Sequence, residues 1–376
     1  MTTHSQDDAW LVVEAPHPSS LDAPEAWAYV GRCLVDAASE TALHGWDDLS
    51  SPAPAVLAAM ADQRHTRKTL LVAVPAGTDP ATAVATDVRG FALVKVPLDD
   101  NLHLAQVSVV VHPEHDADAA LGTALLDRAT AVATAAGRTT AIQATMHAHE
   151  PAEGPGSLTS PTGSGRVPTD APAVRRVLDA GWTLVQVERH SILPLPADPA
   201  EVEGWRAASA ARAGADYRAV TWDDAIPPER LGQVAHLMQR MSTDAPSGEA
   251  ALEEESWDAE RYGDLVDALH AGGRRLLMTV VEHVPTGDLV AFTLFVHPVD
   301  QPAFAFQEDT LVLREHRGRR LGMLAKATNL AALAAIRPSV ERVHTWNAQE
   351  NGPMLDINVA MGFAPSGVVA LWQRGL

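Results

Sequence analysis

A basic, glycine-containing segment between two apolar runs is the part of this chain whose residue types best suit an anion. Arg317–Gly322 reads Arg-Gly-Arg-Arg-Leu-Gly. The run that ends at Thr310–Leu313 is typical of a strand, and Leu321–Ala335 favours helix at almost every position. First-turn amides of a helix are unpaired, and the helix dipole favours negative charge there. The flanking arginines suit a pyrophosphate, and an ordinary turn with solvated arginines is the alternative.

Two blocks of sequence carry a family resemblance. The segment from Thr310 to Gly322 resembles the acetyl-CoA signature of the GNAT acetyltransferase superfamily, in which an apolar strand precedes Arg/Gln-x-x-Gly-x-Gly/Ala. Arg317 and Gly322 match this signature, whereas Arg320 occupies the central glycine position. A second block resembles the fifth strand, the next helix and the terminal Gly-Phe of the superfamily; it comprises Val343–Asn347, Asn351, Met354, Asn358 and Gly362-Phe363. Together the two blocks are specific.

The resemblance implies acetyl-CoA as co-substrate and a small amine as acceptor, with direct attack of the amine on the thioester in a ternary complex. Backbone amides of the basic loop would hold the pyrophosphate, and the strand edge before it would pair with the pantetheine arm, assisted by an asparagine. A helix cap is the alternative role for either asparagine. The residues expected to bind the co-substrate are Val312, Leu313, Arg317, Gly318, Arg319, Arg320, Leu321, Gly322, Asn347 and Asn351.

The usual proton donor of the superfamily is missing. Many members carry a tyrosine four residues before the Gly-Phe glycine, and Asn358 stands there instead. The three tyrosines of the chain, Tyr29, Tyr217 and Tyr262, lie elsewhere. Three explanations stay open: the thiolate leaves unassisted or takes a proton from water, another side chain supplies the proton, or the protein is not catalytic.

Two adjacent carboxylates are the expected catalytic residues. Glu308 and Asp309 precede the loop at the point where the fourth and fifth strands should splay, and either would accept the amine proton. Strand alternation predicts that only one of them faces the cleft. His344 and Glu282 are weaker candidates, because a lone histidine in a strand is more often a packed residue than a base.

The order of elements indicates two copies of one plan and an α/β (α+β) fold class. We expect two tandem GNAT domains, each a mixed, mostly antiparallel central sheet flanked by helices, with boundaries 1–195 and 196–376. A Gly/Ser/Thr/Pro-rich insertion at about 151–172 is expected to be mobile. The resemblance covers nearly the whole chain and extends to two-domain actinobacterial GNAT proteins such as the mycothiol synthases.

Only the second copy has a loop suited to acetyl-CoA. The first copy has lost the arginine and gained Asp116 and Asp118, which would repel a pyrophosphate but would suit a helix N-terminus as caps. We therefore interpret residues 1–195 as a degenerate structural partner. Binding of CoA there through backbone amides alone is the alternative.

Composition and net charge limit the classes of partner, metal site and cellular location that we expect for this chain. The chain has 376 residues and a net charge of −20, which disfavours nucleic acid. One cysteine, Cys33, excludes an intramolecular disulfide and a cysteine metal cluster, and no metal site is expected. No apolar run is long enough to span a bilayer and no signal peptide is evident, so a cytoplasmic location is expected. The sequence does not predict an oligomeric state.

These observations predict an acetyl-CoA-dependent N-acetyltransferase of tandem GNAT type with its co-substrate in the C-terminal domain. A non-catalytic acyl-CoA-binding regulator is the alternative, motivated by the missing tyrosine. An aminoacyl transferase that draws on charged tRNA is a third possibility, which the acidic charge disfavours.

Overall fold

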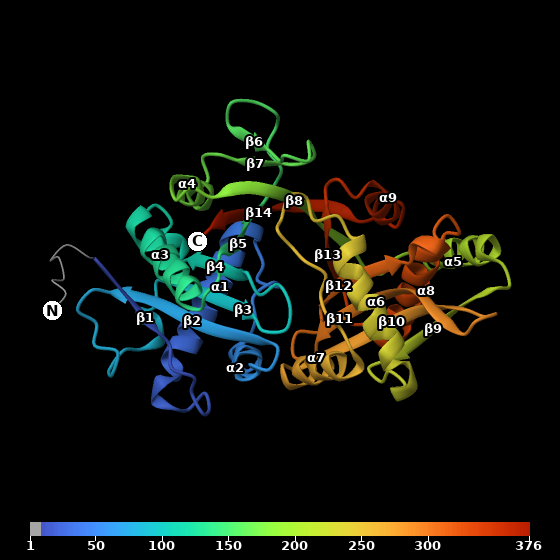
Figure 1. The fold of residues 1–376 in the computed structure, drawn as a ribbon, viewed down its shortest axis with the longest axis horizontal. Helices are drawn as coiled ribbons and strands as arrows, with labels where there is room; N and C mark the ends of the chain where they lie inside the picture. The colour runs from blue at the N-terminus through green and yellow to red at the C-terminus, as the bar shows by residue number, and fades with distance from the viewer. Residues whose placement is uncertain (1–8) are drawn as a thin grey trace. The chain divides into compact units, whose positions relative to one another are not determined.

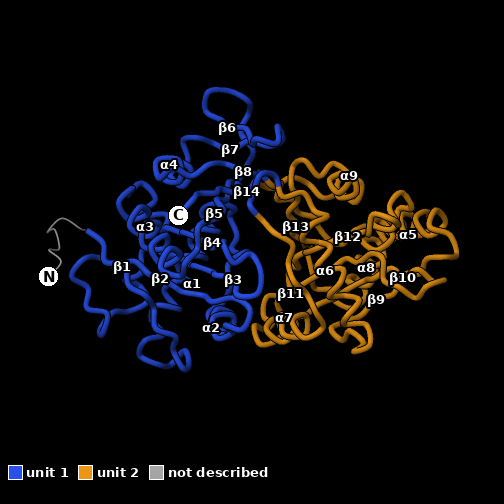
Figure 2. The backbone as a smooth tube through the Cα atoms, viewed as in Figure 1, with its two compact units in different colours: residues 1–187, 248–251, 368–376 blue, residues 188–247, 252–367 orange. Residues whose placement is uncertain are grey.

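A computed structural model of the chain describes residues 9–376 (Figure 1). The chain forms two compact units (Figure 2). Unit 1 comprises residues 1–187, 248–251 and 368–376, and unit 2 comprises residues 188–247 and 252–367.

The sheet of unit 1 contains the strand order β1-β2-β3-β4-β5-β14, in which only β4 and β5 pair in parallel. Its elements are β1 (Trp10–Glu14), α1 (Trp27–His44), α2 (Ala53–Ala61), β2 (Thr66–Pro75), β3 (Gly90–Pro97), β4 (Leu104–Val111), α3 (Ala119–Ala135), β5 (Thr140–His147), β6 (Ser157–Thr159), β7 (Arg166–Pro168), α4 (Pro172–Asp179) and the first part of β8 (Thr183–Pro194). The end of the last strand, β14 (Ala364–Gly375), completes this sheet by pairing with β5.

Unit 2 repeats the plan with the order β8-β13-β12-β11-β10-β9, and only β12 and β13 pair in parallel. Its elements are α5 (Pro199–Ala213), β9 (Tyr217–Asp223), α6 (Leu231–Asp244), α7 (Ala259–Ala271), β10 (Arg274–His283), β11 (Asp288–Pro298), β12 (Phe304–Val312), α8 (Leu321–Ile336), β13 (Arg342–Ala348) and α9 (Gly352–Ala360). The expected fold class, a mostly antiparallel sheet flanked by helices in two copies, is confirmed.

Each sheet is covered on both faces, because its central strands bury apolar residues on either side. In unit 1, Leu71 and Ala73 of β2 pack with α3 and α4, while Leu70 and Val72 pack with α1 and α2. In unit 2, Leu277 of β10 packs with α5 and α8, and its neighbours in β10 pack with α6 and α7. In each unit, the helix that follows the fourth strand therefore packs against the sheet beside the parallel strand pair. This helix is α3 in unit 1 and α8 in unit 2.

The chain passes between units earlier than the expected boundary at 195/196. Unit 1 ends at Val187, inside β8, and the rest of β8 from Glu188 pairs with β13 of unit 2. Conversely, Val368–Leu376 belongs to unit 1. Each sheet therefore contains a strand segment from the other half of the sequence, which the order of elements alone does not reveal.

The insertion at 151–172 contains a two-stranded antiparallel hairpin, β6–β7. Val167 of this hairpin is fully buried in the core of unit 1, and Leu158 packs against the same cluster. These two apolar residues therefore anchor the segment to unit 1. The Gly/Ser/Thr/Pro-rich composition of the segment gave no indication of this packing.

Candidate functional site

The parallel pair β12–β13 opens into a splay in the middle of unit 2. Pairing runs from Phe304↔Arg342 to Gln307↔Thr345 and stops there, although both strands continue. On the other side of β12, Gln307 pairs with Phe295 and Thr310 with Thr293, so Glu308 and Asp309 together face a single residue of β11. This is a β-bulge. Regular strand alternation predicted that only one of the two carboxylates would face the cleft. The bulge interrupts this alternation, and both carboxylates line one pocket.

A cavity of about 740 Å³, here called the groove, extends from this splay to the N-terminus of α8. It is lined by the end of β12, the basic loop and α8, the end of α6, and α9. No side chain caps α8; its N-cap residue, Arg320, has a left-handed backbone with φ 61°. The first-turn amides of α8 therefore lie at the groove without a capping side chain, as an anion site requires.

Three arginines surround one carboxylate at the groove. The buried Asp244 side chain pairs with Arg240 at 2.9 Å, Arg314 at 3.3 Å and Arg317 at 3.0 Å. Because one carboxylate balances three guanidinium groups, this cluster keeps a net positive charge. Asp244 lies far from the loop in sequence and was not predicted; only the structure shows that it holds Arg317.

Most of the residues expected to bind the co-substrate line the groove. They are Val312, Arg317, Gly318, Arg320, Leu321, Gly322 and Asn351. Asn347 instead lines the neighbouring pocket, where its Oδ1 accepts a 2.5 Å hydrogen bond from Asn358.

Leu313 and Arg319 do not line the groove. The Leu313 amide donates to Val290 O, so it stays bound to β11, and β12 ends one residue earlier. Arg319 turns back, donating to Glu315 O at 3.2 Å and lying over the Tyr217 ring. The strand edge that faces the groove is accordingly Thr310–Val312.

A smaller cavity of about 130 Å³, here called the chamber, lies at the splay itself. Its walls are residues 307–310 of β12, residues 345–347 of β13, and Met241, Lys326, Asn351 and Met354. Thr310, Asn351, Met241 and Met354 also line the groove, so the two cavities share walls. A thioester that enters along the groove would present its carbonyl to a nucleophile in the chamber.

The carboxylates of the chamber have pKa values near neutrality. Glu308 remains accessible to water, but desolvation by surrounding protein, together with the charge of Asp309, raises its pKa to about 7. Desolvation, reinforced by Glu255, raises the pKa of Asp309 to about 6. A base in this range matches the pH at which a neutral amine must be generated.

The other residues considered from sequence have structural roles. His344 is fully buried, stacked on His190, with its Nδ1 3.1 Å from His190 Nε2. Glu282 pairs with Arg218 and Arg230.

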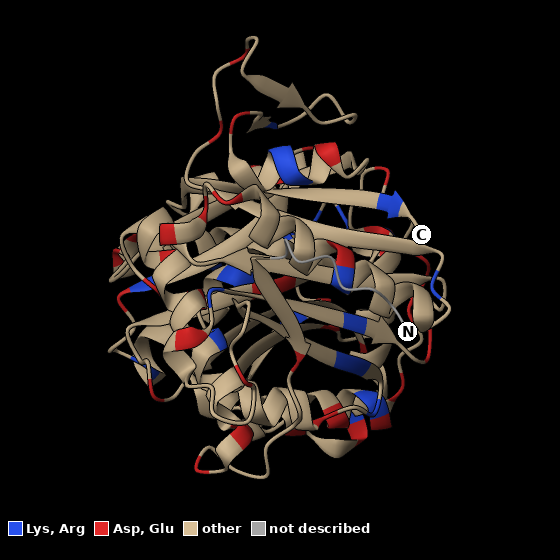
Figure 3. Ribbon diagram, turned by 90° about the vertical axis from the view of Figure 1, so that its left-hand side faces the viewer, with Lys and Arg blue, Asp and Glu red and all other residues tan. Residues whose placement is uncertain are grey.

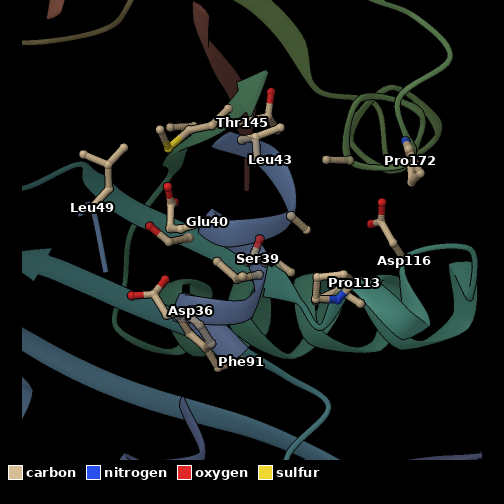
Figure 4. A pocket seen from close by; sticks show the side chains of 18 of the residues that line it. Asp36, Ser39, Glu40, Leu43, Leu49, Phe91, Pro113, Asp116, Thr145 and Pro172 are labelled. Carbon is tan, nitrogen blue, oxygen red and sulfur yellow. The ribbon is translucent and has the colours of Figure 1, made fainter. Parts of the chain in front are cut away.

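Unit 1 has a counterpart cavity of about 600 Å³ between β4, β5, α1 and α4 (Figure 4). Asp118 caps α3 by accepting from the amides of Ala120 and Leu121, as its position in the sequence predicted. Acidic side chains of α1 and of the loop, labelled Asp36, Glu40 and Asp116, surround the cavity. The N-terminus of α3, which corresponds to the N-terminus of α8 at the groove, is therefore already occupied by the Asp118 carboxylate.

A half-buried arginine, Arg176, also lines the unit 1 cavity. A Cβ placed on Gly122 of α3 would lie 2.2 Å from Arg176 Nη1, so the guanidinium rests directly on this glycine. At the equivalent Gly322, a Cβ would have only Ile357 Cδ1 at 3.4 Å and Val312 at 3.6 Å. Arg176 and Ile357 each stand five residues before the glycine that ends their helix, Gly181 and Gly362.

Comparisons with solved structures identify the fold. A tandem GNAT protein from the clavulanic acid biosynthesis pathway, solved without acetyl-CoA, aligns with a TM-score of 0.69 and 24% identity over 97% of this chain and 98% of its own. The chain has a tandem GNAT fold. A GCN5-related N-acetyltransferase from Sphaerobacter thermophilus aligns with a TM-score of 0.59 and 14% identity over 99% of this chain and 97% of its own.

A third solved structure, a GCN5-related glucosamine N-acetyltransferase region in a fungal multi-domain GH3 β-N-acetylglucosaminidase, has a TM-score of 0.57 and 14% identity over 97% of this chain and 38% of its own. No protein-family model matches the chain, and no curated protein matches it either.

Within residues 9–376, no helix combines the length and the apolar character that a membrane span needs. The same residues contain no cluster of three or more side chains suited to a metal ion. In the ribbon of Figure 3, segments coloured for acidic residues and for basic residues are interspersed along the chain.

Proposed function

We infer that this protein is an acetyl-CoA-dependent N-acetyltransferase with its co-substrate in unit 2 and a small amine as acceptor. The observation that carries the inference is the contrast between two equivalent helix N-termini. That of α8 is uncapped, basic and open to the groove, whereas that of α3 is capped by Asp118 and covered by Arg176.

The residues of the groove fit the chemical groups of acetyl-CoA. Amides from Gly318 to Gly322 and the arginine cluster match a pyrophosphate. The edge of β12 at Thr310–Val312 is not paired with β13 and offers backbone groups to the pantetheine amides, apart from the Val312 carbonyl, which accepts from Arg317 Nε at 3.0 Å. Asn351 lines the same groove. No metal or further cofactor enters the proposal.

The chamber supports a cationic amine as acceptor. Glu308 and Asp309 line it and Glu255 acts on Asp309, so the local field favours a positively charged ligand. A carboxylate there would remove a proton from the bound ammonium. The neutral nitrogen would then attack the thioester carbonyl, forming the C–N bond as the C–S bond breaks.

Calorimetry with acetyl-CoA tests this proposal first, on the wild type and on Arg317→Glu. We expect one site per chain and at least a tenfold loss of affinity in the variant. Arg319→Glu is the matched control, because it makes the same charge change in the same loop on a side chain that turns away from the groove. Thiol release from acetyl-CoA is then followed over a panel of small amines.

Each outcome discriminates between hypotheses. Two sites per chain would show that unit 1 also binds. Binding without thiol release on any amine would favour the alternative of an acyl-CoA-binding regulator. Absence of binding to the wild type would overturn the proposal.

A further inference from the structure

A single lysine is buried in the chamber. Lys326 is the only charged residue of α8, and it is 1% exposed in a helix whose other buried residues are mostly Ala, Leu and Met. Its side chain is part of the chamber wall. Burying an unpaired ammonium is costly, so a lysine retained here points to a use for its proton.

The surroundings of Lys326 leave its Nζ unpaired. Among residues 9–376 no hydrogen bond or ion pair engages it, and Nζ lies over the Phe363 ring, 5.4 Å from the ring centroid. From β12, Glu308 and Asp309 line the same chamber without pairing with it. β13 presents Thr345 and Asn347, and the titratable His344 of that strand is stacked on His190.

Met241 of α6 brings no ionisable group to the chamber, and the remaining wall is α9, whose one acid, Asp356, lines the groove and not the chamber. It contributes Met354 to the chamber, and Asn351 stands at its N-terminus. Asn358, at the position where many superfamily members carry tyrosine, is buried and donates its amide to Asn347. A carboxamide cannot give up a proton at neutral pH, so a side chain that protonates the leaving thiolate would have to come from another element.

We propose that Lys326, as its ammonium, protonates the CoA thiolate that leaves during acyl transfer. The inference rests on the proposed function and assigns the acid that the sequence lacks. The acceptor nitrogen bonds to the carbonyl carbon, the C–S electron pair goes to sulfur, and a proton passes from Nζ to sulfur. The carboxylates of the chamber take the proton lost by the nitrogen, and both groups are reset by exchange with water.

The proton affinity of this site agrees with such a role. Desolvation lowers the pKa of Lys326 to about 7. An ordinary lysine at pH 7 would hold its proton too tightly to serve as an efficient acid, whereas one that titrates near the working pH transfers it readily.

The test compares thiol release from acetyl-CoA by the wild type, Lys326→Met and Lys326→Gln. Hydroxylamine serves as a small general acceptor, beside any amine found active in the panel. We expect kcat to fall on the order of 100-fold in both variants while the acetyl-CoA Kd stays within about threefold. The fall of wild-type kcat above about pH 7 should be absent from both variants.

Asn329→Ala is the matched control. Asn329 is a buried polar residue of the same helix that binds Leu277 O and Thr279, away from the chamber. This variant should lower the melting temperature and keep the alkaline fall of kcat. The comparison distinguishes the effect of destabilising α8 from the effect of removing the proton donor.

Several results would overturn the inference. Lys326→Met with kcat within twofold of the wild type would exclude a proton donor at this position. Full activity in Lys326→Gln would show that hydrogen bonding, not proton transfer, is what the lysine provides. A loss confined to acetyl-CoA affinity would give Lys326 a binding role only. Failure of the proposed function is recognised separately, because the wild type itself would then release no thiol.

Discussion

At the residue scale, the chamber brings together carboxylates whose pKa values are displaced toward neutrality. The cause is geometric: the bulge in β12 turns Glu308 and Asp309 into one pocket, where loss of water and mutual repulsion oppose ionisation. The same arrangement that selects a cationic amine therefore also supplies a base.

The carboxylates should determine the acidic limb of the pH profile. In the wild type, kcat/KM should rise with pH through about 6 to 7 as Asp309 and Glu308 ionise. The double change Glu308→Gln with Asp309→Asn should lower kcat/KM on the order of 100-fold. The measurement is thiol release as a function of pH, with Glu282→Gln as a carboxylate control outside the chamber. Unchanged kcat/KM in the double variant would exclude both residues as the base.

Lys326 should also leave a signature in stability that needs no substrate. Its pKa is about 7 in the folded protein and ordinary, near 10.5, in the unfolded chain, so the unfolded chain binds more protons between these values. Unfolding free energy should therefore rise with pH across this window. Lys326→Met should lack this contribution and be more stable than the wild type at about pH 7. Urea denaturation at a series of pH values measures the free energy of unfolding of both proteins. If that free energy changed equally with pH in the two proteins, Lys326 would not titrate as inferred.

Sequence reasoning indicated most of the residues that line the candidate site, but not Lys326 or Asp244. Arg317, Gly318 and Gly322 carry a local signature, and Glu308 and Asp309 stand at a predictable distance before it. No family motif includes Lys326. It is, however, the one charged residue in an Ala/Leu-rich helix, and this observation could have identified it from the sequence. Asp244 reaches the loop only through the tertiary fold, so spacing gives no indication of it.

At the element scale, the basic loop depends on two left-handed residues before α8. Gly318 has φ 79° and Arg320 has φ 61°. Glycine adopts this conformation without penalty, whereas a residue with a Cβ does so at a cost of about 1–2 kcal/mol. The chain therefore accepts strain at Arg320, where the family signature has glycine, and keeps one more cation at the groove.

Substitutions at these two positions should act on stability in opposite directions. Arg320→Gly should raise the free energy of unfolding by up to about 1 kcal/mol, and Gly318→Ala should lower it by about 1–2 kcal/mol. Urea denaturation of both variants beside the wild type measures this. Destabilisation by Arg320→Gly would mean that contacts of the arginine side chain outweigh its backbone strain.

Elements were predictable where the pattern is local. The hairpin β10–β11, the amphipathic α6 and the capped start of α3 follow from apolar spacing, a turn signal and Asp118. The bulge in β12 was not predictable, because it depends on how two strands pair. The hairpin β6–β7 was missed since its anchor is little more than Val167 and Leu158 within a polar segment.

At the scale of the whole molecule, the division of the sequence and the division of the structure differ. The repeat predicts two halves, and the fold has two units, but β8 and β14 each contribute residues to both. A break at 195/196 would leave unit 1 without Val368–Leu376 and unit 2 without the part of β8 that pairs with β13. The repeat therefore predicts the plan of each unit without showing which residues complete it.

The end of the chain should therefore govern the stability of the sheet formed mostly by its beginning. Trp372 is fully buried beside β5 and donates from Nε1 to Thr145 at 2.9 Å. Trp372→Ala should cost about 3–5 kcal/mol, since it opens a large cavity and removes a buried hydrogen bond; the Thr145 hydroxyl keeps its 2.9 Å contact with His147 Nε2. Hydrogen exchange resolved along the sequence should show β5 and α3 losing protection before β12 and α8. Leu34→Ala, at a side chain of α1 that is 49% exposed, is the control and should change little. If the variant instead loosened β12 and α8 first, the C-terminal strand would stabilise its own half of the sequence, and the assignment of residues 368–376 to unit 1 would fail.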